Sequence, residues 1–509
     1  MHTPLVNYNI AASILKRGQL DPNNRAYVFE GIERSYDELN SRVLRLAQSL
    51  REQGVCLGDR VGFLGLNHPH FIETMLATQA LGAIFVPLNF RLTGEELTYI
   101  INDAGIHTLV VDDALTPVVS PICEDLCCKR YIASESAQQN WDTLDNIFAA
   151  DSAITSPVET SENETAVIMY TSGTTGRPKG AMLTHGNLMW NNIQAAYALP
   201  SRADDISLVC APLFHIGGLN VTTIGAMQAG ACLVIHRSFD PEKTLADITK
   251  YRVTTMFAAP AMLLFMTQQP QFTDSDLSSL RMIVVGAAPV PRSLLEVFTA
   301  RDVALNQGYG LTETSPLVSF LMQQYTEDKL GSAGKPGLFG EIQVVDAGGN
   351  SVAAGEVGEI LYRGPNVMKG YWNRPEATAD AIDEKGWFHT GDAGYLDDDG
   401  FLFISDRVKD MVISGGENVY PAEVESVLFE HEAIAEVAII GLPDDKWGEA
   451  VTAVVALHEG ASLSLEQLRE FAEGKLARYK LPLRLHLIPA LPRNPAGKIL
   501  KYQLREELA

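Results

Sequence analysis

Positive charge, long apolar runs and cysteines at metal-binding spacings are all scarce in this 509-residue sequence. It has 39 Lys and Arg against 63 Asp and Glu, a formal net charge of −24. So acidic a chain is a poor candidate for general nucleic-acid binding, and any polyanionic ligand needs cations concentrated locally. No run of about 18 apolar residues occurs, so we expect no transmembrane span. The first residues lack a basic start followed by an apolar block, so we expect no secretory signal.

The cysteines and histidines do not indicate a metal centre. No pair of cysteines has the spacing of a zinc ribbon or of a CxxC motif, and the eleven histidines form no HExxH helix. We therefore expect no structural metal, and we expect free, reduced thiols in a cytoplasmic protein. The six cysteines are Cys56, Cys123, Cys127, Cys128, Cys210 and Cys232.

The sequence has an ordinary globular balance, with 46% hydrophobic and 20% charged residues. Residues 35–38 form a capping box, and apolar residues at helical spacing follow until Gly54. Strands are expected at residues 60–64, 84–86 and 107–111, and helices at 71–81 and from Thr93. The same rhythm returns from about residue 205 to 310. This alternation predicts an α/β fold, with mainly parallel sheets flanked by helices.

The pattern changes further along the chain. Residues 340–405 show short strands with glycine turns, which suggests a small antiparallel, barrel-like part. Beyond Arg407, about 100 residues suffice for a small α/β domain. We therefore predict two domains, residues 1–406 and residues 407–509. The polar stretch 138–164 is expected to be a loop or a peripheral helix.

One segment dominates the chemistry. An apolar strand at residues 166–170 runs into TSGTTGRPKG at residues 171–180. Its glycines let backbone N–H groups converge, its hydroxyls add donors, and Arg177 and Lys179 add positive charge, which together suit a polyphosphate. It is not a Walker A loop, because Lys179 is followed by glycine.

This segment resembles the phosphate loop of the adenylate-forming superfamily, which includes acyl- and aryl-CoA synthetases, luciferases and peptide-synthetase adenylation domains. Other segments resemble that family in the right order along nearly the whole chain. The similarity is greatest to fatty-acyl-CoA and feruloyl-CoA ligases, through residues 409–425. The resembling segments are residues 170–185, 211–215, 285–289, 307–314, 386–392, 406–410 and 492–498.

The resemblance implies ATP, Mg²⁺ and coenzyme A as cofactors, and it implies roles for single residues. The implied nucleotide and coenzyme A contacts are Thr171, Ser172, Gly173, Thr174, Thr175, Lys179, Gly286, Ala287, Ala288, Gln307, Gly308, Tyr309, Thr312, Asp392, Arg407, Gly415, Gly416, Glu417 and Lys498. The implied catalytic residues are Lys498, His215, Lys409 and Thr171, and the implied metal ligands are Glu313 and Thr171. The implied acyl pocket consists of His215, Gly217, Gly218, Val221, Ala259 and Gly310.

Each implied role has an ordinary alternative. Glu313 could be a solvated surface acid, Asp392 a turn-capping residue, Arg407 and Lys498 exposed cations, and His215 a core histidine. We favour the functional interpretation because of the motifs. A carboxylate oxygen beside phosphates suits Mg²⁺, and a lysine on a loop tip can bridge a carboxylate and the α-phosphate during transfer.

The implied reaction has two steps. A carboxylate attacks the α-phosphorus of MgATP, giving acyl-AMP and pyrophosphate while Lys498 orients both reactants. The small domain then swings about Lys409. Coenzyme A enters along residues 414–418, and its thiol attacks the mixed anhydride and releases AMP.

The acid itself is predicted from the pocket segments. Residues 254–269 carry no charge and three methionines. We expect a core helix there or, if it lines the pocket, a site for a long apolar chain. No cation is present for a second carboxylate, and no aspartate follows Phe214 to hold an α-amino group. The prediction is a medium- or long-chain fatty acid, with an aryl acid of the feruloyl or 4-coumaroyl type as the alternative.

Two other functions stay open from the sequence. A luciferase-type oxidative enzyme would share the same motifs, and so would a catalytically silent nucleotide-binding regulator, although Lys498 and Glu313 speak against the latter. We expect a stand-alone ligase without a carrier domain, because the sequence stops at Ala509. Its expected partners are a small carboxylic acid, ATP and coenzyme A, without nucleic acid or a membrane span. A homodimer is among the alternatives for its assembly.

Overall fold

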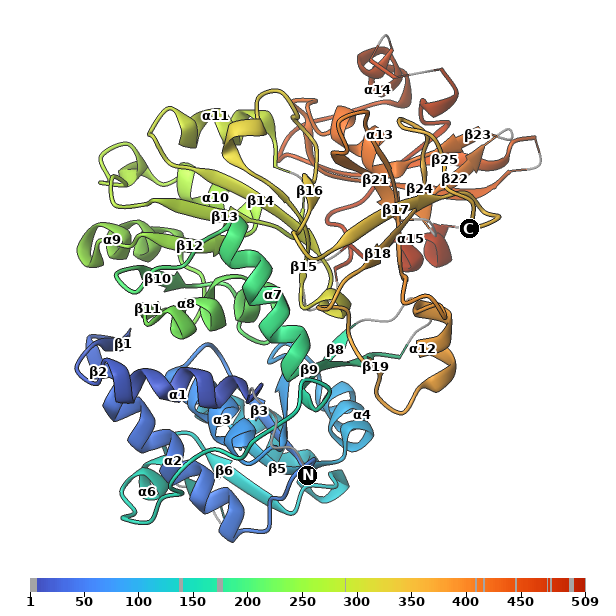
Figure 1. The fold of residues 1–509 in the computed structure, drawn as a ribbon. Helices are drawn as coiled ribbons and strands as arrows, with labels where there is room; N and C mark the ends of the chain where they lie inside the picture. The colour runs from blue at the N-terminus through green and yellow to red at the C-terminus, as the bar shows by residue number, and fades with distance from the viewer. Residues whose placement is uncertain are drawn as a thin grey trace. The chain divides into compact units, whose positions relative to one another are not determined.

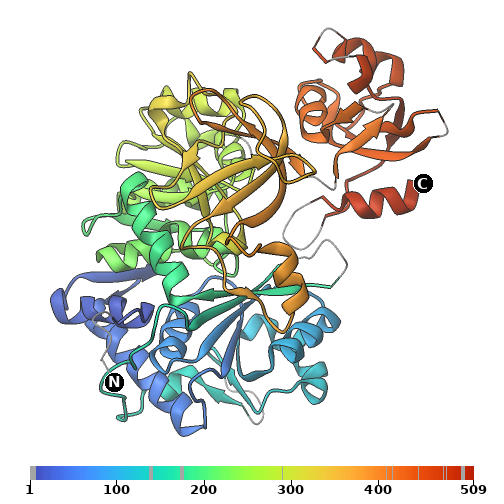
Figure 2. The same ribbon diagram turned by 45° about the vertical axis from the view of Figure 1, so that its right-hand side comes forward.

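The computed structural model describes residues 7–136, 141–171, 177–288, 290–407, 410–414, 417–444, 446–473, 475–476, 478–493 and 499–508. The chain forms two compact units (Figures 1 and 2). The first comprises Met1–Ile342 and Tyr362–Phe388, and the second Gln343–Leu361 and His389–Ala509. The predicted division into residues 1–406 and 407–509 marks the point about which we expect the C-terminal part to move, and it stays a prediction.

An eight-stranded sheet forms one half of the first unit. Its strands, in spatial order, are β19 (Gly370–Tyr371), β9 (Lys179–Thr184), β8 (Thr165–Thr171), β4 (Ile84–Leu88), β3 (Arg60–Leu64), β5 (Ile106–Val111), β6 (Arg130–Ala133) and β7 (Asp142–Thr143). The strands from β8 to β7 are parallel, whereas β9 and β19 are antiparallel to their neighbours. The strands expected at residues 60–64, 84–86 and 107–111 are confirmed.

Helices cover both faces of this sheet. The predicted capping box, Ser35 with Glu38, is present before α2 (Tyr36–Glu52). The helix expected from Thr93 is α4 (Gly94–Ala104), and it too begins with a capping box, Thr93 with Glu96. Leucines of α2 pack with α3 (Pro69–Ala80) in one apolar cluster, and α4 packs in another. In β3 the side chains of Val61 and Phe63 belong to the first cluster and Leu64 to the second. The two-faced packing explains why these strands are apolar throughout.

A nine-stranded sheet forms the other half. Its order is β16 (Lys335–Pro336), β15 (Leu317–Leu321), β14 (Leu305–Gly310), β13 (Met282–Val285), β12 (Thr255–Ala258), β10 (Ile206–Val209), β11 (Cys232–Ile235), β1 (Arg25–Phe29) and β2 (Ile32–Ser35). The strands from β14 to β1 are parallel. The chain passes from β10 to β11 on one side and then to β12 on the other. The carboxyl ends of β10 and β12 therefore flank a topological switch point, where open α/β sheets bind ligands.

The helices of this half also lie on two faces. Residues of α8 (Ile224–Ala229) pack in the cluster that contains α2 and α3. Residues of α9 (Pro241–Tyr251), α10 (Pro260–Thr267) and α11 (Arg292–Thr299) pack in a separate cluster. Residues 254–269 are thus not the single helix that we expected. Pro260 begins α10 as its first helical residue, a position that proline favours.

The two halves exchange segments. β1 and β2 follow α1 (Ile10–Leu20) near the start of the chain, yet β1 pairs with β11 of the nine-stranded sheet. Figure 1 shows β1 and β2 beside β11 and α8. In the other direction, β19 comes after the nine-stranded sheet in the sequence and pairs with β9. The halves therefore form one unit rather than two successive domains.

The second unit contains two smaller sheets. A four-stranded sheet has the order β17 (Glu341–Val345), β18 (Gly358–Arg363), β20 (Phe388–Leu396) and β21 (Leu402–Arg407), where we expected the barrel-like part. A five-stranded sheet follows. It contains β22 (Val412–Ser414), β23 (Glu417–Val419), β24 (Ile434–Asp444), β25 (Gly448–Leu457) and β26 (Arg484–Leu487), with α13 (Pro421–Leu428), α14 (Leu465–Ala472) and α15 (Lys501–Leu508). The predicted α/β class, with large parallel sheets and a small C-terminal part, is confirmed.

The polar stretch at residues 138–164 contains a short helix, α6 (Leu144–Phe148), whose Leu144, Ile147 and Phe148 are buried in the core of the first unit. No helix among the described residues is long and apolar enough to cross a membrane.

Candidate active site

The glycine-rich segment joins two paired strands. Thr171 at the end of β8 lies opposite Lys179 at the start of β9. Four predicted phosphate-binding residues between them, Ser172, Gly173, Thr174 and Thr175, lie outside the described residues. The cations after them face aromatic rings. The Lys179 ammonium is 5.2 Å from the ring centroid of Tyr371, and the Arg177 guanidinium is 5.2 Å from that of Tyr99.

A buried carboxylate lies beside this hairpin. Glu313, in the 3-10 turn Thr312–Thr314 after β14, is only 8% exposed. Its Oε1 accepts a hydrogen bond of 2.9 Å from the Tyr371 hydroxyl and one of 3.4 Å from Thr171 Oγ1. The fold thus brings together Thr171 and Glu313, which the sequence predicted as metal ligands. Carboxylate and hydroxyl oxygens are hard donors that suit Mg²⁺ together with substrate phosphates, so this donor set fits that ion.

Small residues at the carboxyl ends of β13 and β14 allow a ligand to approach the backbone closely. Ala287, next to Gly286 and Ala288, has φ of 73°, an uncommon value for a residue with a side chain. A Cβ on Gly310 would lie 1.7 Å from the Pro316 carbonyl oxygen, so only glycine fits there. Strained backbone of this kind clusters at ligand sites. Gly286, Ala287 and Ala288 at this edge are among the nucleotide contacts that the family resemblance implies.

Gln307 and Gly308 on β14 adjoin the same edge. Gln307 is 8% exposed, and its Nε2 is buried without a hydrogen-bond partner among the described residues. An unpaired buried amide costs about 1–3 kcal/mol, and an acceptor on a bound ligand would offset that cost. Tyr309 and Thr312 come from the same strand and the turn after it.

Five of the six predicted acyl-pocket residues follow β10 or β12 at the switch point, whereas Gly310 ends β14. A helix begins at Ile216 and contains a π-helical stretch, Gly218–Thr223, of the kind frequent at functional sites. A Cβ on Gly217 would lie 3.0 Å from the Phe257 ring, whereas a Cβ on Gly218 would lie 2.2 Å from the Pro212 carbonyl oxygen. Gly217 therefore borders an aromatic side chain, and Gly218 permits backbone packing.

The other pocket residues agree with this placement. Val221 is 8% exposed and packs in an apolar cluster that also contacts Phe257. Ala259 directly follows β12, which carries Phe257. The residues around Phe257 thus form an apolar wall at the carboxyl end of β12.

His215 is neutral at physiological pH. Burial, with a smaller contribution from the Arg91 charge, lowers the pKa of His215 to about 4. Its neighbour Phe214 packs edge-on against Phe90 at a centroid distance of 5.4 Å. Sequence reasoning missed Asn67, whose side-chain amide binds the Ala211 carbonyl and the Leu213 N–H at 2.9 and 2.8 Å. Asn67 fixes the segment before His215, and only its long-range contacts reveal this.

The second unit holds the remaining predicted residues. Asp392 on β20 is 5% exposed and lies directly opposite Arg407 on β21. Its backbone N–H donates to Thr390 Oγ1 at 3.0 Å. Lys409, Gly415, Gly416 and Lys498 lie outside the described residues, as do the side chains of Arg407 and Glu417. Their predicted roles stay predictions.

Within the first unit, the fold therefore joins a threonine- and glycine-rich hairpin, a buried carboxylate, two cations and an apolar wall at a switch point. The cations Arg177 and Lys179 can bind a polyphosphate, and Glu313 with Thr171 can hold its metal. The apolar wall can receive an uncharged part of a second substrate.

Comparisons with known proteins agree with this chemistry. The family model described as AMP-binding enzyme matches residues 15–372, and the model of its C-terminal domain matches residues 423–498. A feruloyl-CoA synthase from Amycolatopsis sp is 40% identical, covering 98% of this chain and 99% of the relative. A long-chain-fatty-acid–CoA ligase from Mycobacterium tuberculosis is 38% identical, covering 98% of both chains.

A solved structure is similar over nearly the whole chain. The o-succinylbenzoate CoA synthetase from Bacillus subtilis, in complex with its acyl-adenylate intermediate, superposes with a TM-score of 0.88 at 34% identity, covering 97% of this chain and 98% of that one. The same synthetase in complex with ATP and a magnesium ion gives a TM-score of 0.87 at 33% identity, covering 97% and 99%.

Proposed function

The chain belongs to the AMP-binding enzyme family and is an AMP-forming acid–thiol ligase that uses ATP, Mg²⁺ and coenzyme A, and from this premise we propose that its acid is a medium- or long-chain fatty acid. The apolar wall around Phe257 carries this proposal. Gly217 adds no side chain in front of that ring, and Val221 and Ala259 extend the wall without a charged group. Such a surface suits a methylene chain.

An aryl acid is the second candidate. The 40% identity to a feruloyl-CoA synthase supports it, and the Phe257 ring could pack against the ring of such a substrate at a centroid distance of about 4.5–7 Å. A fatty acid and an aryl acid differ in length and width. We therefore expect the steric limits beside Gly217 and Phe257 to decide between the two candidates.

We assign the first half-reaction to the residues around the hairpin. Glu313 and Thr171 would hold Mg²⁺, which supplies neutralisation of phosphate charge. Lys179 lies opposite Thr171 in the hairpin, and Lys498 is assigned to orient the carboxylate and the α-phosphate. The carboxylate oxygen attacks the α-phosphorus, the bond to the bridging oxygen breaks, and pyrophosphate leaves. His215 stays neutral, so it adds no charge to the acyl side of the site.

The second half-reaction is assigned to the C-terminal part after a movement about Lys409, between domains 1–406 and 407–509. Gly415, Gly416 and Glu417 would line the path of pantetheine, because glycines permit close approach of a linear chain. The thiol sulfur attacks the acyl carbonyl, loses its proton, and AMP leaves. We place the reaction in the cytoplasm, which is supported by six cysteines that are all free.

A panel of acids tests the proposal. The purified protein is given ATP, Mg²⁺ and each of a series of straight-chain acids, ferulate and indoleacetate, and AMP and pyrophosphate are measured with and without coenzyme A. We expect coenzyme A-dependent AMP formation that rises with chain length. Preference for ferulate would replace the fatty acid by the aryl candidate. Light or oxygen consumption would indicate a luciferase-type enzyme, and no product with any acid would indicate a regulator.

A further inference from the structure

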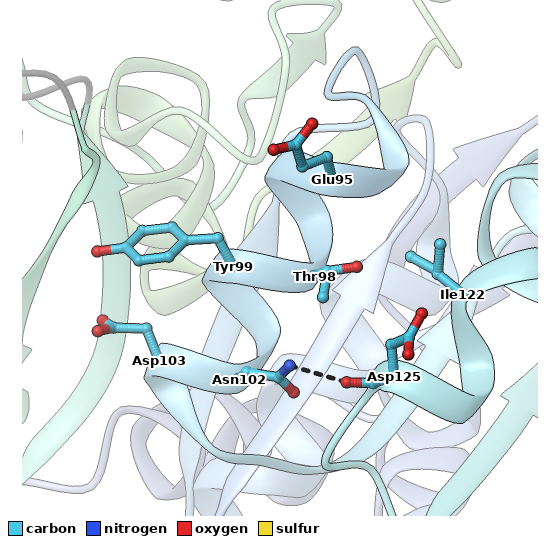
Figure 3. A pocket seen from close by; sticks show the side chains of 7 residues that line it. All are labelled: Glu95, Thr98, Tyr99, Asn102, Asp103, Ile122 and Asp125. Carbon is cyan, nitrogen blue, oxygen red and sulfur yellow. Dashed lines mark hydrogen bonds between the residues drawn. The ribbon is translucent and has the colours of Figure 1, made fainter.

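One face of α4 contacts the β8–β9 hairpin, which carries the glycine-rich segment. Tyr99 and Asp103 are four residues apart on this helix, so their side chains share a face. Figure 3 shows both projecting from one side of α4, whereas Asn102 projects toward Asp125 on the other. These residues line an open pocket of about 630 Å³. The two sides of the helix therefore have different neighbours.

The carboxylate of Asp103 joins two distant parts of the chain. Its Oδ2 accepts a 2.7 Å hydrogen bond from the hydroxyl of Tyr170, the residue before Thr171. Its Oδ1 accepts a 2.7 Å charge-assisted bond from Arg374. The Asp103 side chain is only 13% exposed, and bonds of this kind are stronger than those between neutral groups.

Tyr99 contacts the other arm of the hairpin. Its hydroxyl donates to the Pro178 carbonyl and accepts from Arg374, both at 3.3 Å. The Arg177 guanidinium faces the same ring. One turn of α4 thus fixes Tyr170 on one flank of residues 172–176 and Arg177 and Pro178 on the other.

The same contacts extend to Glu313. The indole N–H of Trp372 donates to the backbone carbonyl of Asp103 at 3.1 Å, and its own backbone N–H donates to Gly180 at 2.7 Å. The residue before it, Tyr371, binds Glu313 through its hydroxyl. Two hydrogen bonds, joined through the peptide bond between Tyr371 and Trp372, therefore connect α4 with the carboxylate that fits Mg²⁺.

We propose that Asp103 and Tyr99 are positioning residues for acyl-adenylate formation, because they hold both flanks of the phosphate-binding segment and, through the segment that carries Tyr371 and Arg374, the position of Glu313. This inference rests on the proposed adenylation chemistry. Misplacing reacting groups by about 1 Å can cost about a hundredfold in rate. Loosening the hairpin should therefore slow attack on ATP without affecting thioester formation from an adenylate already made.

The test compares Asp103→Asn with Asp125→Asn. Both remove one carboxylate from the wall of the same pocket, but only Asp103 binds the hairpin. Acid-dependent ATP–pyrophosphate exchange and thioester formation from supplied acyl-AMP are measured separately, together with the thermal midpoint. For Asp103→Asn we expect kcat/KM for ATP in exchange to fall about ten- to a hundredfold. Its thioester formation, and both reactions of Asp125→Asn, should stay at the wild-type level.

A second variant keeps the test decisive if Asp103→Asn folds poorly. Tyr170→Phe removes only the hydroxyl, so we expect a smaller loss of the same selective kind. Because both residues share one hydrogen bond, the two losses should not be additive in the double variant. Equal loss of both half-reactions, additive losses, or unchanged exchange would overturn the inference. Absence of exchange in the wild-type protein would instead contradict the proposed function.

Discussion

Gly217 and Gly218 are adjacent in the chain, but a side chain at each would meet a different neighbour. At Gly217 the backbone has φ of −60° and ψ of −50°, which any residue can adopt, and the obstacle is the Phe257 ring. At Gly218 the obstacle is the Pro212 carbonyl, which cannot rotate away as a side chain can. Variants at the two positions can therefore separate the proposed effect on substrate selection from an effect on folding.

Gly217→Tyr should shorten the acid that the enzyme accepts. The added ring would occupy space beside Phe257, and overpacking of this kind costs about 1–3 kcal/mol. We expect kcat/KM to fall about ten- to a hundredfold for long or ring-bearing acids, with little change for acetate-sized ones. Steady-state kinetics over the acid panel measures this.

Gly218→Ala is the matched control. Its Cβ would clash with backbone, so we expect a lower thermal midpoint and a similar loss for every acid. If Gly217→Tyr also lost activity uniformly, Gly217 would not set pocket depth, and the fatty-acid proposal would lose its main support.

Lys498 is the residue whose role is most specific to one half-reaction. If its ammonium bridges the carboxylate and the α-phosphate, Lys498→Ala should abolish acyl-adenylate formation. It should leave thioester formation from supplied acyl-AMP intact, because that step involves no attack on the α-phosphorus, which is the event to which Lys498 is assigned. Separate assays of the two half-reactions decide the point. Equal losses in both would show that Lys498 does not serve adenylation alone.

At the scale of elements, local patterns in the sequence predicted more than distant pairings. The capping boxes before α2 and α4 and the strand β3 could be predicted because their determinants lie within a few residues. The uncharged run at residues 254–269 could not be divided from hydrophobicity alone, because a buried strand and a buried helix are both apolar throughout. The proline at position 260 was the available signal.

The same contrast between local motifs and distant contacts applies to the residues of the candidate site. Thr171, Lys179 and Glu313 stand in recognisable motifs, and the fold brings Thr171 and Glu313 together. Asp103 stands in no motif, and its two side-chain partners are 67 and 271 residues away. Such a residue becomes visible only when the sheets have placed α4 behind the hairpin.

The link between β21 and β22 is where the sequence predicts that the C-terminal part moves. It comprises residues 408–411 and includes Lys409, and the carboxylate of Asp410 within it binds Arg505 of α15 at 3.0 Å. Proline at position 409 would fix φ near −65°. We therefore expect Lys409→Pro to make acyl-AMP but not the thioester. Rapid-quench detection of enzyme-bound acyl-AMP is the measurement, and normal overall turnover would exclude a pivot at Lys409.

At the scale of the whole molecule, buried histidines make the free energy of unfolding depend on pH. Burial is the main cause that lowers the pKa of His68 to about 2, of His70 to about 3, and of His185 and His215 to about 4. In the unfolded chain these groups have a pKa near 6.5. Their contribution is therefore complete above about pH 6.5 and is lost as the pH falls toward 4, because the unfolded state binds the protons first.

His185 offers a direct test of this dependence. Its Nδ1 accepts a 3.2 Å hydrogen bond from the N–H of Ile10 at the start of α1, which requires a neutral ring nitrogen. Thermal midpoints measured from about pH 7 to pH 5 should fall steadily in the wild-type protein. In His185→Gln they should fall less, because about 1.4 kcal/mol is lost per pH unit for each such histidine between its two pKa values. An equal slope in both proteins would show that His185 is not protonated on unfolding.

The exchange of segments between the two large sheets has a consequence for synthesis on the ribosome. β1 cannot pair with β11 until β11 has been synthesised. The strand β9 likewise cannot pair with β19, which begins at Gly370, until β19 has been synthesised. At about 5–20 residues per second, the interval between completing β9 and making β19 is about 10 to 40 s. During that interval the edge of β9 is uncovered, and exposed edges invite wrong pairing. The nascent chain therefore reaches its native topology late, and a ribosome stalled before residue 370 would carry an aggregation-prone sheet.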